Sequence, residues 1–391
     1  MNNINWIKKS DRINKLPPYL FFEIRKAKEE AARRGLDIID LGEGDPDQPT
    51  PQNIIDKLKE ASQNSENHKY PSSYEGLSEL RKAIADWYKS RFNVLLNPDE
   101  EVLVLIGGKE GIGHLSFAFV NPGDVVLVPS PGYPVYSNST ILARGDPFTM
   151  PLIKRNNFFP DLSSIKTDIA SKAKLMFLNY PNNPTSAVAN KEFFFKVVEF
   201  AKKYNIIVCH DNPYSEIAFD GFKPMSFLQI PGSKEVGVEF HSFSKTYNMA
   251  GWRIGFVVGN KKVLEGLLKI KSQLDSGVPQ AIQFGAIEAL TGPQESVHKL
   301  IKIYQERRDI LVEGLKELGW EVEKPKATFY VWATVPKGYT SAEFSVRLLS
   351  KKGIVVTPGS AYGEAGEGYI RMALVVDKER LKEAVDRIKG I

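Results

Sequence analysis

The stretch HSFSKTYNMAGWRIG, residues 241–255, brings a serine, a lysine and an arginine close together in the chain. Ser242 lies three residues before Lys245, and Arg253 follows eight residues after that lysine, between two glycines. The apolar run GVEFHSF leads into the stretch, so these side chains follow the end of a predicted strand. A hydroxyl, a primary amine and a fixed cation at one strand end raise the question of which other residues would complete a site.

The length and composition are those of a globular protein with more than one domain. A chain of 391 residues is too long for one small core and favours one large and one smaller domain. The net charge of +5, from 52 basic and 47 acidic residues, is a weak bias. It suits anionic metabolites, whereas a nucleic-acid partner would require a clustered basic face.

Other classes of protein are disfavoured by what the sequence lacks. The single cysteine, Cys209, excludes an internal disulfide and a cysteine cluster for zinc, and the five histidines show no ligand spacing. No GxGxxG motif follows a strand, which argues against a nicotinamide cofactor. The N-terminal segment has no apolar core of a signal peptide, and no run reaches the ~18 apolar residues of a membrane span. We therefore expect a cytoplasmic protein with no metal and no membrane partner.

Apolar strands alternate with amphipathic helices through most of the chain. Continuous apolar runs such as VLVLI (102–106), DVVLVPS, AKLMFLNY, NIIVCHD and GVEFHSF are typical of strands buried on both faces. A helix is predicted from about residue 110 to 119. The pattern predicts an α/β fold with a mostly parallel sheet. From about residue 291 a long charged helix leads into short strands and helices, which indicates a smaller α+β domain.

Chemically useful groups follow five of these strands. The strand ends carry GGKEG, PSPGYPVY, PNNPT, DNPYSE and SKT in turn. Ligands of open parallel sheets bind beyond the carboxyl ends of the strands. Each motif alone has an ordinary structural explanation as a turn, a helix cap or a surface side chain, but together they match every part of one cofactor, pyridoxal 5′-phosphate.

A lysine amine can bind the aldehyde of that cofactor, and Lys245 would serve. The phosphate, the ring and the substrate then need further groups. We expect these roles from phosphate donors (Gly108, Lys109, Ser242 and Arg253), a carboxylate for the pyridine nitrogen (Asp211), donors to the ring oxygen (Asn183 and Tyr214), a stacking ring (Tyr133) and a bidentate partner for the substrate α-carboxylate (Arg371).

The chain resembles the class I/II aminotransferases of fold type I over nearly its whole length. The matching motifs are YPSSYEGL, GGKEG, PNNPT, DNPYSE, SFSKTYNMAGWRIG and the late IRMAL. The resemblance implies a seven-stranded, mostly parallel sheet in a large cofactor-binding domain of residues 49–291. It implies a small domain of residues 1–48 and 292–391. It also implies Lys245, Asp211 and Tyr214 as catalytic residues.

Family dimers build each site from two chains, so the resemblance implies a homodimer. By the same resemblance Tyr70 would reach the phosphate bound in the neighbouring subunit. Tyr19 and the segment around Ser276 would also approach that neighbour's site.

Within this family the chain resembles the LL-diaminopimelate aminotransferases, which act in lysine biosynthesis. The residues that carry this likeness lie in LPPYLFFEI, LGEGDPDQPTP, HKYPSSYEGL and LIGGKEGI. Such enzymes exchange an amino group between LL-2,6-diaminopimelate and 2-oxoglutarate. The resemblance implies substrate contacts from Arg371, Gly44, Tyr19, Lys109, Asn183 and Tyr133, and it offers Glu75 for the distal amine. The chain departs from the family pattern at Gly108, where serine is frequent, and at Ser186, where glycine usually follows the threonine.

Three other functions remain open at this point. The same cofactor site would serve an aspartate, alanine or aromatic aminotransferase, because only contacts to the distal part of the substrate separate these enzymes. A β-lyase or racemase could use the same fold. A binding protein without catalysis is disfavoured by the intact Lys245, Asp211 and Arg371.

Overall fold

A seven-stranded sheet forms the centre of the larger part of the molecule. The computed structural model describes residues 7–18, 20–71 and 73–391. In spatial order the strands are β2 (Val102–Leu105), β8 (Gly255–Gly259), β7 (Gly237–Ser242), β6 (Ile207–Asp211), β5 (Ala173–Asn179), β3 (Val125–Ser130) and β4 (Asp146–Pro151). Only β8 runs antiparallel to its neighbours, and the other pairs are parallel. The predicted mostly parallel sheet is confirmed.

Two strands of this sheet were not among the expected ones. β4 carries two prolines, and most of its side chains are at least partly exposed, because it lies at the sheet edge. It therefore lacks the continuous apolar pattern of a buried strand. β8 follows directly on the motif that contains Arg253, and the short connection conceals its start in the sequence.

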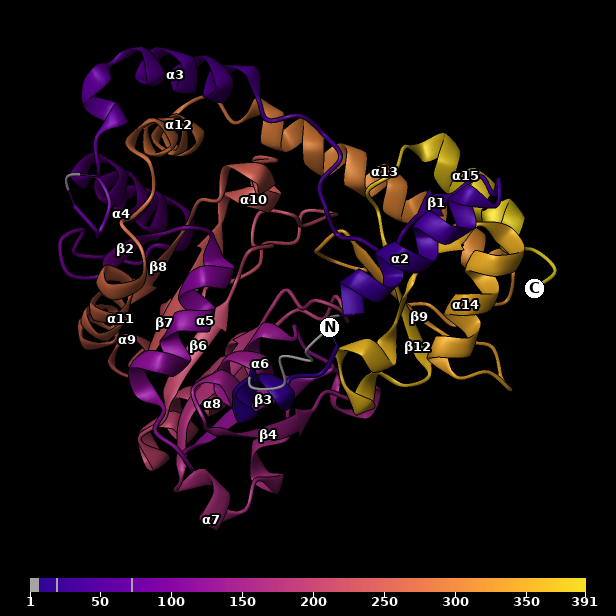
Figure 1. Ribbon diagram of the computed structural model, residues 1–391, viewed down its shortest axis with the longest axis horizontal. Coiled ribbons are helices and arrows are strands. Elements are labelled where there is room, and N and C mark those ends of the chain that lie inside the picture. Colours follow the sequence, from indigo (N-terminus) through magenta and orange to yellow (C-terminus); the bar gives the residue numbers. More distant parts are fainter. Residues whose placement is uncertain (1–6, 19, 72) are drawn as a thin grey trace.

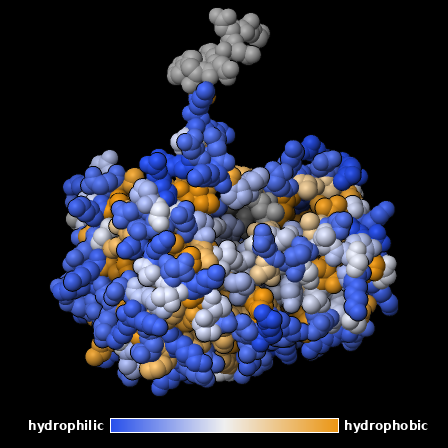
Figure 2. Space-filling model, turned by 90° about the horizontal axis from the view of Figure 1, so that it is seen from below, coloured by the Kyte–Doolittle hydropathy of each residue, from blue (hydrophilic) through white to orange (hydrophobic). Residues whose placement is uncertain are grey.

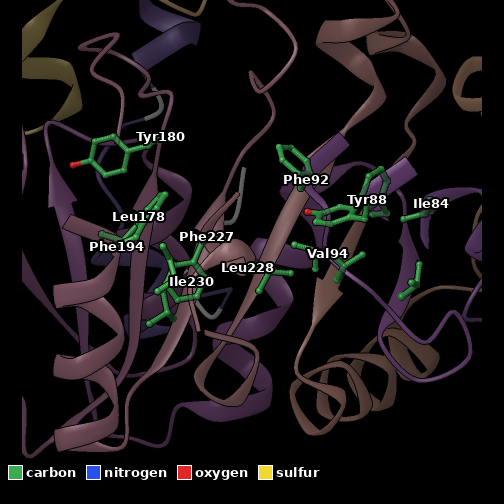
Figure 3. Packing of buried hydrophobic residues seen from close by; sticks show 14 of the residues in the cluster. Ile84, Tyr88, Phe92, Val94, Leu178, Tyr180, Phe194, Phe227, Leu228 and Ile230 are labelled. Atoms are coloured by element: carbon green, nitrogen blue, oxygen red, sulfur yellow. The ribbon is translucent and has the colours of Figure 1, made fainter. Parts of the chain in front are cut away.

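Helices cover both faces of the sheet because alternate strand residues point to opposite sides. Along β2, Val102 and Val104 belong to one hydrophobic cluster, and Leu103 and Leu105 belong to another. The first face is covered by α3 (Gln52–Gln63), α4 (Ser78–Phe92), α8 (Lys191–Tyr204) and α12 (Gln280–Thr291). The second is covered by α5 (Gly108–Phe119), α6 (Val135–Leu142) and α11 (Lys261–Leu274). Figure 3 shows part of the first cluster.

The C-terminal part forms a second layer of structure with its own core. The long helix α13 (Glu295–Glu317) leads from the large sheet toward it (Figure 1). A three-stranded antiparallel sheet consists of β11 (Thr357–Pro358), β12 (Tyr369–Ala373) and β9 (Tyr330–Thr334). The helices α14 (Ser341–Lys352) and α15 (Lys378–Ile388) pack with it around a third hydrophobic cluster.

The N-terminal segment joins this C-terminal layer. Strand β1 (Ile39–Asp40) pairs in parallel with β10 (Ile354–Val355), and Ile39 and Leu41 belong to the third cluster. Helix α2 (Leu20–Arg33) contacts α14. This arrangement supports the predicted division at about residues 48 and 292, which we retain as a proposal.

The remaining helices are short, and the surface is mainly polar. They are α1 (Asp11–Asn14), α7 (Thr167–Ala170), α9 (Ser233–Val236) and α10 (Phe243–Thr246). Figure 2 shows hydrophilic side chains over most of one face, with hydrophobic ones scattered among them. Within the described part of the chain, no helix combines the length and the apolar character needed to cross a membrane.

Candidate active site

A cavity of about 520 Å³ lies where the strands of the large sheet end and the C-terminal layer begins. The parallel strands deliver their C-terminal residues to one edge, as expected for such a sheet. Of the predicted site residues, those that line the cavity are Gly44, Gly108, Lys109, Tyr133, Asn183, Asp211, Tyr214, Ser242, Lys245, Arg253 and Arg371. Tyr70 lies outside this lining and is 84% exposed, and Tyr19 is outside the described residues.

Lys245 is half-buried in the short helix α10, directly after β7. Its Nζ donates a hydrogen bond of 2.9 Å to the carbonyl oxygen of Gly44. Burial lowers the pKa of Lys245 to about 8; the charges of Arg371 and Arg253 act in the same direction, and that of Asp45 opposes them. A substantial fraction of this amine is therefore neutral near pH 8, as a nucleophile or a proton acceptor must be.

Asp211 ends β6 with its side chain buried at the base of the cavity. The hydroxyl of Tyr136 donates a 2.7 Å hydrogen bond to Oδ2 of Asp211. Burial raises the pKa of Asp211 to about 6, although Tyr136 and the charge of His210 act against this rise. A carboxylate in this position is matched to a cationic partner, which would restore its preference for the ionised form.

The start of α5 and the Lys245 loop form a cradle suited to a phosphate. Gly108 begins α5, and the N-terminus of a helix favours anions. At Gly107, where φ is +77°, a Cβ atom would lie 2.5 Å from Nη2 of Arg253. Glycine is therefore needed for the guanidinium to approach the helix start. The Ser242 hydroxyl also lines the cavity beside these groups.

Arg371 projects from β12 and is almost fully buried. Its Nη1 donates to Oδ1 of Asn183 at 2.9 Å, and its Nη2 donates to the carbonyl oxygen of Gly42 at 2.6 Å. The guanidinium carbon lies 4.2 Å from the centre of the Tyr330 ring. Its Nε has no hydrogen-bond partner among the described residues. A buried cation held in this way has capacity left for a carboxylate.

Tyr214 and the pair of Lys109 and Tyr133 complete the predicted set. Tyr214 is buried, and burial together with nearby Tyr330 raises the pKa of Tyr214 well above its usual range. The two hydroxyls are 3.1 Å apart. Nζ of Lys109 lies 5.8 Å from the centre of the Tyr133 ring. These groups stand on the cavity wall near the end of β3.

Two residues of the site were missed by reasoning from the sequence. Tyr136 lies three residues after Tyr133 in PSPGYPVY, and its position one helical turn away was an available signal. Tyr330 begins β9 in a different layer, and nothing in its local sequence, ATFYVW, indicates an approach to Tyr214. The contact is decided by how the two layers meet.

Two further residues that the resemblance offered lie away from the cavity. Glu75 is not part of its lining and accepts a 2.5 Å hydrogen bond from the Ser73 hydroxyl. This bond lowers the pKa of Glu75. Ser276 is exposed on the segment after α11. Any role of either residue at an active site would thus have to be in a neighbouring molecule.

Comparison with known proteins agrees with this geometry. The family model described as aminotransferase class I and II matches residues 36–388. The chain belongs to the class I and II aminotransferases. The matched region includes every lining residue named above except Arg25, which α2 contributes to the cavity.

Curated relatives within the aminotransferases match nearly end to end. A protein from Moorella thermoacetica named LL-diaminopimelate aminotransferase is 57% identical over 380 residues, which are 97% of this chain and 97% of that protein. A protein of the same name from Halothermothrix orenii is 56% identical and covers 97% and 98%.

Solved aminotransferase structures share the whole fold. Substrate-bound BacF from Bacillus subtilis superposes with a TM-score of 0.94 at 43% identity, covering 98% of this chain and 97% of that one. A probable N-succinyldiaminopimelate aminotransferase from Thermus thermophilus has a TM-score of 0.88 at 36% identity, covering 94% and 99%.

Aminotransferases of this class use pyridoxal 5′-phosphate, and the cavity fits it. The amine of Lys245, the carboxylate of Asp211 and the cradle at Gly108 and Arg253 provide for the aldehyde, the ring nitrogen and the phosphate. When bound, the cofactor accepts the amino group and withdraws electrons from the substrate Cα. The residue roles rest on this fit and remain our proposal.

Proposed function

We propose that this aminotransferase exchanges an amino group between LL-2,6-diaminopimelate and 2-oxoglutarate, forming tetrahydrodipicolinate and glutamate in lysine biosynthesis. The observation that carries the substrate assignment is the 57% identity, over 97% of both chains, to a relative of that name. The cavity geometry supports the reaction class, because it gathers an amine, a buried carboxylate and a buried guanidinium.

In this proposal each side chain has one task. Arg371 binds the α-carboxylate of the amino acid and thereby orients the Cα–H bond for removal of its proton. Nζ of Lys245, with its pKa lowered to about 8, accepts that proton and returns it on the other side of the exchange. Asp211, ionised, holds the proton on the pyridine nitrogen. Asn183 and Tyr214 donate to the ring oxygen, and Tyr133 stacks on the ring.

We further propose a homodimer with shared sites in the cytoplasm. The support for sharing is the position of Tyr70, which is exposed and outside the lining of its own cavity. A phenol in that position is available to another molecule. The cytoplasmic location follows from the biosynthetic role of the relatives.

An absorbance titration of the cofactor-loaded protein tests the substrate. LL-diaminopimelate, meso-diaminopimelate, aspartate, alanine and glutamate are added separately without a keto acid. We expect the visible band of the bound cofactor to disappear with LL-diaminopimelate and with glutamate only. Conversion by aspartate or alanine would retain the aminotransferase and reject the diaminopimelate substrate. Release of pyruvate and ammonia would instead identify a β-lyase.

A further inference from the structure

Glu43 projects from the cavity wall between two backbone carbonyls that hold proposed catalytic and binding groups. The carbonyl of Gly42 accepts from Arg371, and the carbonyl of Gly44 accepts from Lys245. The carboxylate of Glu43 is part of the cavity lining. An amino acid held by Arg371 and presented to Lys245 would therefore have this carboxylate beside it.

The carboxylate of Glu43 lacks a hydrogen-bond donor. Its Oε1 is shielded from solvent, and none of the described residues donates to it. The nearest cation is the guanidinium of Arg25, whose Nη2 lies 3.7 Å away, beyond hydrogen-bond distance. A buried acceptor without a donor is costly, and a bound ammonium would remove this cost.

Arg25 is held opposite Glu43 by the way α2 is anchored. Lys28, three residues further along the same helix face, donates a 2.7 Å hydrogen bond to Oδ2 of Asp40. The other oxygen of Asp40 accepts from the backbone N–H groups of Gly42 and Glu43, at 2.9 and 3.3 Å. The helix and the loop are thus tied together, and Arg25 also lines the cavity.

We propose that Glu43 and Arg25 recognise the distal end of a substrate that carries a second amino-acid group. Glu43 accepts hydrogen bonds from the distal ammonium, and the guanidinium of Arg25 binds the distal carboxylate. The two opposite charges, separated by more than a hydrogen bond, complement a zwitterion rather than a simple anion. This inference rests on the proposed function, in which Arg371 binds the α-carboxylate at the other end.

The pair also discriminates between the two amino donors of the proposed reaction. Glutamate presents a distal carboxylate and no distal ammonium, so it uses only Arg25 and is repelled by Glu43. LL-diaminopimelate satisfies both groups. Specificity would then come from attraction of one substrate and repulsion of the other at a single carboxylate.

Replacement of Glu43 by the isosteric amide separates these effects. For Glu43→Gln we expect kcat/KM for LL-diaminopimelate to fall by roughly tenfold or more, because a site built for a hydrogen-bonded cation loses its acceptor charge. The value for glutamate should stay unchanged or rise. Arg25→Gln should lower kcat/KM for both donors. A purely structural role of Glu43 would lower both values together.

Two controls give the outcome a single interpretation. Glu75→Gln tests the other glutamate that the family resemblance offers for the distal amine, and we expect it to leave the ratio between the two donors as in the wild type. The dissociation constant of glutarate, an unreactive dicarboxylate, is measured by calorimetry on each variant. It should be unchanged or lower in Glu43→Gln and higher in Arg25→Gln.

An unchanged donor ratio in Glu43→Gln would overturn the inference, and so would a loss confined to Glu75→Gln. Failure of the wild type to accept LL-diaminopimelate at all is a different result, because it rejects the proposed substrate. If Glu43→Gln loses its thermal stability or its cofactor absorbance, Glu43→Asp replaces it. That variant keeps the charge and should retain the preference for LL-diaminopimelate.

Discussion

At the scale of single residues, the site depends on how closely other groups approach Lys245. Gly44 accepts its hydrogen bond, and a Cβ atom at Gly44 would lie 2.1 Å from the hydroxyl oxygen of Tyr330. Glycine is required there by contact rather than by backbone conformation. The charges of Arg371 and Arg253 add to the effect of burial on the lysine pKa.

The lowered pKa of Lys245 predicts how cofactor capture depends on pH. With a pKa of about 8, roughly a tenth of the amine is neutral at pH 7, against about 0.03% for a lysine with a pKa of 10.5. The rate at which the cofactor-free protein binds pyridoxal 5′-phosphate should rise with pH and level off above pH 8. Rapid-mixing absorbance measures this rate.

A matched variant tests the cause of that pKa. The carboxylate of Asp45 raises the pKa of Lys245, so Asp45→Asn should move the midpoint of the pH profile to lower pH. A midpoint that stays near 10 in the wild type would contradict the lowered pKa. A midpoint that does not move in the variant would assign the shift to burial and the arginines alone.

At the scale of elements, Ser186 connects the loop after β5 to the start of β9. The hydroxyl of Ser186 donates to the carbonyl of Tyr330 at 2.8 Å and lies 2.9 Å from the hydroxyl of Thr328. The N–H of Tyr330 donates to Thr328 Oγ1 at 3.1 Å. Since the single proton of Ser186 goes to the carbonyl, Thr328 donates to Ser186, and the three bonds form a closed ring.

This ring has a cost in backbone conformation, which its hydrogen bonds offset. Ser186 and Thr328 have φ angles of 60° and 70°, in the left-handed region that disfavours residues with a Cβ atom. Thr328→Val should therefore destabilise by about 2 kcal/mol, because it leaves buried groups without partners. Ser186→Gly should cost less than about 1 kcal/mol, because glycine relieves the backbone.

Urea denaturation of the two single variants and the double variant measures this coupling. We expect the double variant to lose less than the sum of the single losses. Additive losses would show that the two hydroxyls act independently. Thr328→Ser keeps the hydroxyl and serves as the control, with stability close to the wild type.

A second connection between elements is the buried carboxylate of Glu239 in β7. It accepts hydrogen bonds from His210 Nδ1 (2.8 Å), His241 Nε2 (3.0 Å), Tyr88 Oη (2.7 Å), Asn212 Nδ2 (3.3 Å) and the backbone N–H of Phe227 (2.7 Å). These donors come from α4, β6, β7 and neighbouring loops. Burial alone would raise the pKa of Glu239, but the bonds from His210 and His241 hold it well below its usual range.

Glu239→Gln should lower the free energy of unfolding by about 3 kcal/mol, because it turns an amide donor toward groups that themselves donate. Glu199→Gln, on the exposed face of α8, should change it by less than about 0.5 kcal/mol. Since the depressed pKa stabilises the fold above the usual range of a glutamate, the difference should persist from pH 8 to 5. It should shrink only as the pH falls below about 4. Urea titrations at several pH values check both statements.

At the scale of the whole molecule, the proposed sharing of sites between two chains can be tested by mixing inactive variants. Lys245→Ala and Tyr70→Ala each remove one contribution to a site. In a mixed dimer the chain with intact Lys245 receives Tyr70 from its neighbour, so one site per dimer is complete. We expect activity to reappear on mixing after mild unfolding and reassembly.

The control is a chain that carries both substitutions, which should restore nothing when mixed with either single variant beyond that variant's own activity. Sedimentation of each sample gives the oligomeric state independently. Absence of rescue between the single variants in a sample that sediments as a dimer would show that Tyr70 serves its own chain or neither.

Much of the fold was predictable because buried parallel strands have a strong local pattern. Continuous apolar runs gave the five strands that end near the site, and periodicity gave α5 and α13. The edge strand β4 escaped because exposure on most of its length removes that pattern. The motifs at the strand ends were also readable, since a parallel sheet places all such ends at one edge.

By itself, then, the sequence determined the α/β class, the cofactor chemistry of Lys245 and Asp211 and the family to which the chain belongs. Only the tertiary structure decided that Tyr330 approaches Tyr214, that Ser186 closes a ring with Thr328, and that Arg25 faces Glu43. These pairs are 116, 142 and 18 positions apart in the chain and belong to different elements. Local periodicity reports which face of an element is buried, whereas the packing of layers fixes which side chains meet.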